Sequence, residues 1–140
     1  MDDLAPVDPR LLEDTYPFQD LLGFRMTHWA EGVARFELPL EAKLLNRYGI
    51  PHGGVYAALL DTVMGYCGSW TGDPDRRQMC MTLSLTTNFL GRATGPMLHG
   101  EGRRIGGGRS TYFAEGRLWD ETGAACATAV GTFRYRRGGA

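Results

Sequence analysis

The stretch NRYGIPHGGVYAALLDTVMGYCGSW, residues 46–70, decides the fold that we expect for this chain. From Gly53 to about Trp70 it contains no proline, shows no alternation of polar and apolar residues, and is longer than an ordinary strand. We therefore predict a helix there that is apolar on nearly all faces and buried. Asp61 is the only carboxylate in the stretch, and a charge in such surroundings indicates either a partner or a chemical role.

Strands are expected on both sides of this helix. Residues 24–40 read as two strands joined at Glu31-Gly32, and one or two helical turns are expected in residues 14–24. Four more strands are predicted in segments rich in β-formers or alternating in polarity: residues 78–90, 96–105, 109–120 and 123–136. Two strands, one long helix and four strands make an α+β domain in which the sheet wraps around the helix.

Length and charge limit the possible functions. A chain of 140 residues with 43% hydrophobic and 22% charged residues is typical of a single globular domain. Its 15 basic and 16 acidic residues give a net charge of -1, which argues against binding to nucleic acid.

The cysteines and the N-terminal residues indicate a cytoplasmic protein. The three cysteines form no C-x-x-C pair, as expected for reduced thiols rather than a disulfide framework. The first 20 residues are acidic and lack the basic and apolar regions of a signal peptide. No segment approaches the roughly 20 apolar residues that span a bilayer, so we expect no membrane association.

The glycine-rich stretch GRRIGGGRS, residues 102–110, partly matches a phosphate-binding loop. Gly108 stands where the G-x-x-x-x-G-K-[ST] pattern has lysine, and the residues that follow alternate like a strand. We therefore predict a turn between two strands. Arg103, Arg104 and Arg109 are candidate contacts for a ligand's phosphates, the alternative being that these cations are simply solvated.

Two other kinds of site are poorly supported. His28, His52 and His99 lie far apart, and none has another ligand at the i,i+4 spacing, so no metal site is expected. A serine hydrolase of the Ser-His-Asp type is also disfavoured, because the chain has no G-x-S-x-G elbow.

The start of the predicted helix and Asp61 together suggest catalysis. Free N–H groups at a helix N-terminus can bind a developing oxyanion, and glycine at positions 53 and 54 would let a ligand carbonyl approach the backbone. Gly53 and Asp61 are eight residues apart, roughly 12 Å along a helix, so one reacting carbonyl cannot contact both. If both serve one reaction, they come from different chains, which predicts a dimer with two symmetry-related sites. Alternatively, Asp61 is a structural charge paired with an arginine.

One set of residues resembles the hotdog-fold acyl-CoA thioesterases, in particular the subgroup related to the phenylacetate-degradation thioesterase: Asn46, Gly49, His52-Gly53-Gly54 and Asp61. The N-x5-H-G-G-x6-D spacing is the most specific part, and the resemblance extends over roughly residues 18–136. It implies an N-terminal arm at residues 1–17 and a hotdog thioesterase domain at residues 18–140.

The resemblance also implies an activity, hydrolysis of an acyl-CoA thioester, and an assembly, a homodimer at least and a homotetramer by family likeness. Asp61 would attack the thioester or activate water, and the Gly53 N–H would polarise the thioester carbonyl. Thr82 matches a serine or threonine that helps to position water in some relatives. No cofactor is implied, apart from coenzyme A as part of the substrate.

The remaining residues of the motif have supporting roles by the same resemblance. Asn46 would orient the water or the carbonyl, and Gly54 would lie against the substrate. His52 would brace the loop through hydrogen bonds rather than transfer protons.

Two rival functions remain open on the sequence. A hotdog hydratase or dehydratase would need a basic histidine paired with a carboxylate at the reacting carbons. A non-catalytic acyl-CoA-binding module would usually carry a DNA-binding segment, for which the roughly 17 residues ahead of the domain are too few and too acidic. The identity of the acyl group is not fixed by the sequence.

Overall fold

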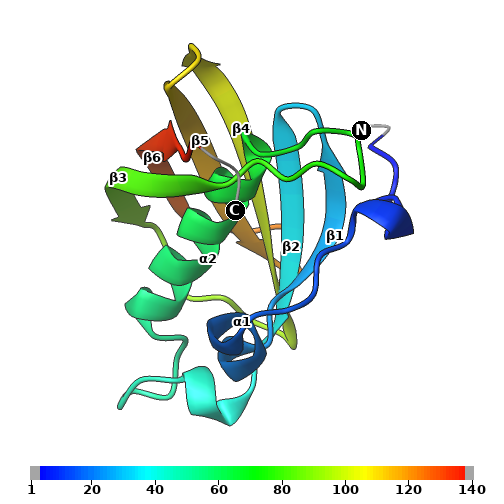
Figure 1. Ribbon diagram of the computed structural model, residues 1–140. Helices are drawn as coiled ribbons and strands as arrows, with labels where there is room; N and C mark the ends of the chain where they lie inside the picture. Colours follow the sequence, from blue (N-terminus) through cyan, green and yellow to red (C-terminus); the bar gives the residue numbers. More distant parts are fainter. Residues whose placement is uncertain (1–3, 138–140) are drawn as a thin grey trace.

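The fold is an antiparallel sheet that curves around one long helix (Figure 1). The computed structural model describes residues 4–137, and the predictions that include residues 1–3 or 138–140 lie in part outside this range. The six strands run in the order β1-β2-β4-β5-β6-β3. Their bounds are β1 Arg25–Ala30, β2 Val33–Pro39, β3 Cys80–Phe89, β4 Met97–Gly107, β5 Thr111–Asp120 and β6 Ala125–Tyr135. The α+β class and all six strands are confirmed.

Helix α2, Gly53–Cys67, is the predicted long helix. His52 is the N-cap residue of this helix, and its ring nitrogen accepts a hydrogen bond from the Gly54 N–H. Serine or aspartate fills this position more often than histidine. The prediction that it extends to about Trp70 is wrong by three residues. The helix ends at Cys67, and at the following Gly68 a Cβ would overlap the ring of Tyr112 on β5, so only glycine fits there.

The burial of α2 differs from the prediction that all faces are covered. Its fully buried side chains follow one stripe along the helix: Val55, Tyr56, Leu59, Leu60, Val63, Met64 and Cys67. Asp61, Thr62, Gly65 and Tyr66 lie at the side of this stripe and stay partly exposed. The composition of the helix does not reveal which face is less covered, because that face carries small apolar residues such as Ala57, Ala58 and Gly65.

Glycines in the sheet let α2 lie close against the strands. A Cβ at Gly102 would overlap the carbonyl group of Val63, and one at Gly116 would meet the side chain of Met64 at 2.9 Å. Gly100 and Gly131 also face the helix, and all four glycines are buried. The many glycines of this chain are thus explained in part by close packing between sheet and helix.

Strand β3 forms one edge of the sheet and is almost entirely exposed. Its ten residues, CMTLSLTTNF, include no charge and no proline, and Met81, Leu83 and Phe89 are each about half exposed. A long, uncharged edge strand with exposed apolar side chains is a ready template for pairing with another strand. This edge is therefore the part of the sheet that most needs a partner.

The shorter predicted features are also present. A six-residue helix, α1 (Pro17–Leu22), lies within the segment expected to hold helical turns, and a 3₁₀ turn at Pro9–Leu11 precedes it. Residues 102–107 of the glycine-rich stretch belong to β4, and residues 108–110 form the turn to β5, in which the Gly108 N–H donates to the Thr111 carbonyl at 2.8 Å. The prediction of a turn rather than a phosphate loop is confirmed.

Candidate functional site

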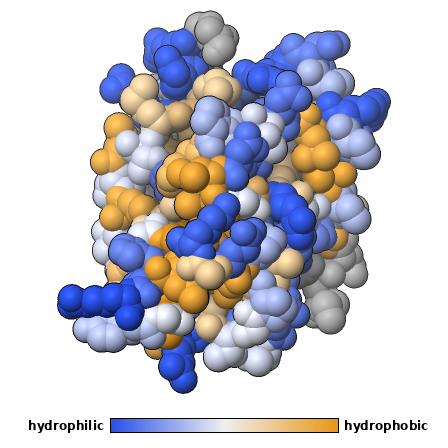
Figure 2. Space-filling view, turned by 90° about the horizontal axis from the view of Figure 1, so that it is seen from below, coloured by the Kyte–Doolittle hydropathy of each residue, from blue (hydrophilic) through white to orange (hydrophobic). Residues whose placement is uncertain are grey.

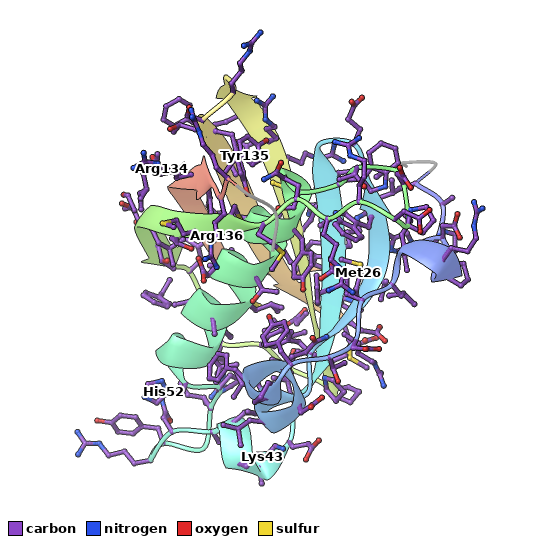
Figure 3. All side chains as sticks on the ribbon, in the orientation of Figure 1. Met26, Lys43, His52, Arg134, Tyr135 and Arg136 are labelled. Atoms are coloured by element: carbon purple, nitrogen blue, oxygen red, sulfur yellow. The ribbon has the colours of Figure 1, made fainter. Side chains whose placement is uncertain are left out.

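The first turn of α2 leaves one backbone donor unused. The Gly54 N–H donates to His52 Nδ1 at 2.7 Å, and the Val55 N–H donates to the His52 carbonyl at 2.9 Å. Within residues 4–137 the Gly53 N–H has no acceptor. Because the first N–H groups of a helix carry partial positive charge, this one can bind a ligand oxygen. Figure 3 shows His52 where the helix begins.

Asn46 closes the loop that leads into the helix. Its side-chain oxygen accepts a hydrogen bond from the Tyr48 N–H at 2.8 Å, and its own N–H donates to the Ile50 carbonyl at 2.8 Å. The Asn46 oxygen is thus committed to the loop. Its side-chain NH₂ group has no partner among the described residues, so this group is left to meet a ligand.

Asp61 lies further along α2 with its carboxylate bound to one hydroxyl. The Thr82 hydroxyl donates to Asp61 Oδ1 at 2.6 Å. No arginine, lysine or histidine within residues 4–137 forms an ion pair with Asp61, so the alternative of a structural ion pair has no support there. A carboxylate with one positioned hydroxyl and free lone pairs can accept a proton or attack a carbonyl.

An open pocket of about 210 Å³ lies beside Asp61. Helix α2 lines one side of it, and the segment ahead of α1 contributes Glu13 and Tyr16. Burial raises the pKa of the Tyr16 phenol, and the negative charges of Asp61 and Glu13 raise this pKa further. A hydrogen bond with Thr62 acts in the opposite direction and lowers the pKa. Both tyrosine and carboxylate groups therefore face this pocket. No local sequence pattern marks Glu13 or Tyr16, because tertiary packing alone brings them to α2.

The motif residues form two groups within one chain. One group lies at the start of α2 and consists of Asn46, His52 and the two glycines. The other is the Asp61–Thr82 pair, and Asp61 is eight residues after Gly53, roughly 12 Å along the helix axis. Strand β3 connects the groups, because Thr82 is near its beginning and Phe89 at its end packs over Gly53, where a Cβ would lie 3.3 Å from the ring. One chain therefore holds both groups without bringing them together.

Apolar side chains surround the helix start. Seen from that end of the molecule, orange apolar surface is exposed between polar patches (Figure 2). Phe18, Leu45 and His52 line a second pocket there, of about 290 Å³, beside Gly54. Phe18 is 51% exposed, so this surface offers apolar contact next to the free Gly53 donor.

The three candidate phosphate-binding arginines do not form one cluster. Arg103 Nε donates to the buried Glu101 carboxylate at 2.9 Å, together with Arg35 at 2.6 Å. Arg104 lies over the ring of Tyr112 at 6.0 Å, and Arg109 is exposed in the turn. Their role in substrate binding stays a prediction.

Within residues 4–137, no three histidine, cysteine, aspartate or glutamate side chains are grouped so as to hold a metal ion. None of the helices in this range is long and apolar enough to cross a membrane.

Comparisons with known proteins agree with the fold and the motif. The sequence model of the thioesterase superfamily matches residues 48–127, which include His52 to Asp61 and Thr82. The putative esterase Rv1847 of Mycobacterium tuberculosis is 26% identical over 119 residues, 84% of this chain and 85% of that protein. The proofreading thioesterase EntH of Klebsiella pneumoniae is 29% identical over 107 residues, 76% of this chain and 77% of that protein.

Solved structures show the same architecture. The conserved protein PA5202 from Pseudomonas aeruginosa superposes with a TM-score of 0.79 at 25% identity, covering 94% of this chain and all of that one. The Escherichia coli PaaI protein superposes with a TM-score of 0.75 at 21% identity, covering 87% of this chain and 85% of that one. The expected hotdog fold and the resemblance to PaaI-type thioesterases are thereby confirmed.

Proposed function

This chain belongs to the thioesterase superfamily, and from that membership we propose that it hydrolyses acyl-CoA thioesters to the free carboxylic acid and coenzyme A. Thioester hydrolysis is the general activity of the family. The observation that carries the proposal is the Asp61 carboxylate, which faces an open pocket, holds one hydroxyl and has no cationic partner among residues 4–137.

The proposed active site is shared between two chains that pair through β3. Thr82, near the start of this strand, donates a hydrogen bond to Asp61, and Phe89, at its end, packs against Gly53. Antiparallel pairing of β3 with a second copy about its middle, near residues 85 and 86, would place Thr82 opposite the partner's Phe89. Asp61 of one chain would then face the partner's Gly53, and the exposed edge would be covered.

In this arrangement each group has one task. The partner's Gly53 N–H and the partner's Asn46 NH₂ bind the thioester oxygen, whose negative charge grows as the carbonyl carbon is attacked. Asp61 takes the proton from the attacking water, with Thr82 holding the carboxylate in place. Collapse of the tetrahedral intermediate breaks the C–S bond, and the thiolate of coenzyme A recovers the proton. Direct attack by Asp61 would instead form a mixed anhydride, which water then hydrolyses.

Isotope labelling separates water attack from a covalent route in which the mixed anhydride is hydrolysed at the Asp61 carboxyl carbon. In a single turnover in H₂¹⁸O, water attack on the thioester places ¹⁸O in the product. Attack by Asp61, followed by hydrolysis at the Asp61 carboxyl carbon, places the heavy atom in Asp61 and leaves the product unlabelled in the first turnover. Mass spectrometry of the acid and of the peptide that contains Asp61 gives the answer.

Coenzyme A phosphates are proposed to bind at the end of the sheet where β6 finishes. Arg109 is close to that end, because the Tyr135 N–H donates to the Ser110 carbonyl at 2.9 Å. Figure 3 shows Arg134 and Arg136 there, and neither forms an ion pair within residues 4–137. These free cations suit phosphate better than Arg103, which is engaged with Glu101. A tetramer built from two such dimers follows from the family likeness and is part of the same proposal.

The test of function is turnover of an acyl-CoA panel. Release of the coenzyme A thiol is followed for wild type and for Asp61→Asn, which keeps the size of the side chain. We expect wild type to hydrolyse some members of the panel, and the variant to lose nearly all hydrolysis while it keeps its thermal stability and still binds acyl-CoA. A variant that loses stability but keeps activity would mark Asp61 as structural.

A further inference from the structure

The side chain of Tyr16 reaches α2 from the segment just ahead of α1. Its ring packs edge-on against Phe24, with 6.3 Å between the ring centroids, and it touches the hydrophobic core while staying partly exposed. The Tyr16 hydroxyl forms a hydrogen bond with Thr62, the residue that follows Asp61 on α2. Packing of the ring and this hydrogen bond therefore hold the phenol oxygen beside the residue on which the proposed chemistry depends.

The oxygens of Tyr16 and Asp61 border the same open pocket, together with Thr82. Thr82 donates to Asp61 Oδ1 at 2.6 Å, and no donor among residues 4–137 contacts the other carboxylate oxygen. A phenol oxygen has one proton and two lone pairs, so one hydrogen bond with Thr62 leaves Tyr16 able to accept another. Two hydrogen-bond acceptors with free lone pairs thus lie at a space that is open to water.

The two acceptors differ in what they can do with a proton. Burial raises the pKa of the Tyr16 phenol, and the negative charge of Asp61 raises it further, against the smaller opposing effect of the Thr62 hydrogen bond. The phenol therefore stays neutral at pH 7, and it can accept a hydrogen bond without taking the proton. Of the two groups, only the Asp61 carboxylate can act as a base.

We propose that Tyr16 and Asp61 together hold the attacking water, and that Tyr16 turns the water's lone pair toward the thioester carbon. The inference rests on the proposed hydrolysis of acyl-CoA by direct water attack. The water donates one O–H to Asp61, which takes that proton, and the other O–H to Tyr16 Oη. With both O–H groups directed in this way, an oxygen lone pair is left to form the bond to carbon.

Tyr16 would then bring chemistry from outside the matched part of the chain. It belongs to the predicted N-terminal arm and precedes residues 48–127, which the family model matches. The arm would thus complete the water-binding part of the site that Asp61 and Thr82 begin.

The first test compares Tyr16→Phe with a matched control. Tyr16→Phe removes the oxygen and keeps the ring that packs against Phe24. For an acyl-CoA that wild type hydrolyses, kcat should fall about tenfold, the effect of one hydrogen bond, with KM within about twofold and Tm unchanged. Tyr66→Phe removes the other phenol of the pocket and should keep the wild-type kcat. Burial and then the charge of Glu13 raise the pKa of the Tyr66 phenol, which places it nearer to Glu13 than to Asp61.

Methanol as a competing nucleophile separates orientation of water from a structural role. Methanol has one O–H, whose proton Asp61 takes, and none for Tyr16. In a mixture of water and methanol, the ratio of methyl ester to free acid should therefore rise about tenfold in Tyr16→Phe, and Tyr66→Phe should keep the wild-type ratio.

The outcomes against the inference are distinct from failure of the proposed function. A distorted site would lower both products together, so an unchanged ratio in Tyr16→Phe would overturn the role of Tyr16. A wild-type kcat in this variant, or a raised KM at unchanged kcat, would overturn it as well. Absence of turnover by wild type over the whole acyl-CoA panel would instead contradict the proposed hydrolysis, and the inference with it.

Discussion

Replacing Gly53 with proline removes one N–H group from the proposed active site and little else. Gly53 is the first residue of α2, where proline is favoured because its fixed φ suits the helix and the missing N–H has no partner within the helix. His52, which would precede the proline, already has φ -66° and ψ 138°, the extended conformation that such a residue requires. No hydrogen bond within residues 4–137 is lost, because the Gly53 N–H donates to none of them.

The size of the expected effect follows from the role assigned to this N–H. Loss of one oxyanion donor lowers kcat by roughly 100- to 1,000-fold, or about 2.7–4 kcal/mol in the transition state. Stability should change little or rise, because proline at a compatible position stabilises by about 0.4–1 kcal/mol through the unfolded state. The added Cβ would lie 3.3 Å from the Phe89 ring, so that ring must shift by a few tenths of an ångström.

Gly53→Ala is the matched control, since it adds the same Cβ against Phe89 and keeps the N–H. The assay measures kcat and KM for one acyl-CoA with both variants, alongside thermal unfolding. We expect the proline variant to fall at least 100-fold below the alanine variant in kcat at similar Tm. Equal kcat in the two folded variants would refute the assignment of the Gly53 N–H as the oxyanion donor.

Thr82→Val should lower kcat about tenfold by releasing the Asp61 carboxylate, whereas Thr82→Ser should stay near wild type; equal rates in the two variants would exclude the hydroxyl. Purified heterodimers of Asp61→Asn and Gly53→Pro chains, co-expressed with two tags, should regain about half of the wild-type activity per dimer, and inactive heterodimers would show that each site is built within one chain. Hydrogen bonds from Thr122 and Thr94 hold the pKa of Asp120 below its usual 3.8, so the stability that this carboxylate contributes is complete above that pH and is lost as the pH falls below it. The Tm of Asp120→Asn should therefore be reduced at pH 7 and should depend less on pH than the wild-type Tm below about pH 4. Parallel acid profiles of Tm for the two proteins would contradict this assignment.

Local signals made the centre of the molecule predictable from sequence. The apolar run after His52-Gly53-Gly54 and the alternation in the later strands depend on residues close in the chain, so α2 and all six strands are found where expected. The predicted end of α2 is three residues too late, because the sequence pattern does not reveal that the residue after Cys67, Gly68, lies against the Tyr112 ring of β5.

Residues brought in by tertiary packing escaped prediction. Glu13 reaches the pocket from the segment ahead of α1, and nothing in its neighbouring sequence marks it. The pairing of Arg103 with Glu101 depends on burial of the carboxylate, which an alternating strand sequence does not reveal.

Substitutions in the row of glycines beneath α2 should affect the chemistry of the proposed active site. Gly100, Gly102, Gly116 and Gly131 set the depth at which the helix lies in the sheet. A Cβ at Gly102 would overlap the backbone of Val63, so a side chain there would lift the helix and shift Gly53 and Asp61 with it. Such a change would disturb both halves of the proposed site at once, at positions that never touch the substrate. Directed evolution of substrate range should therefore leave this row untouched and vary the pocket wall instead.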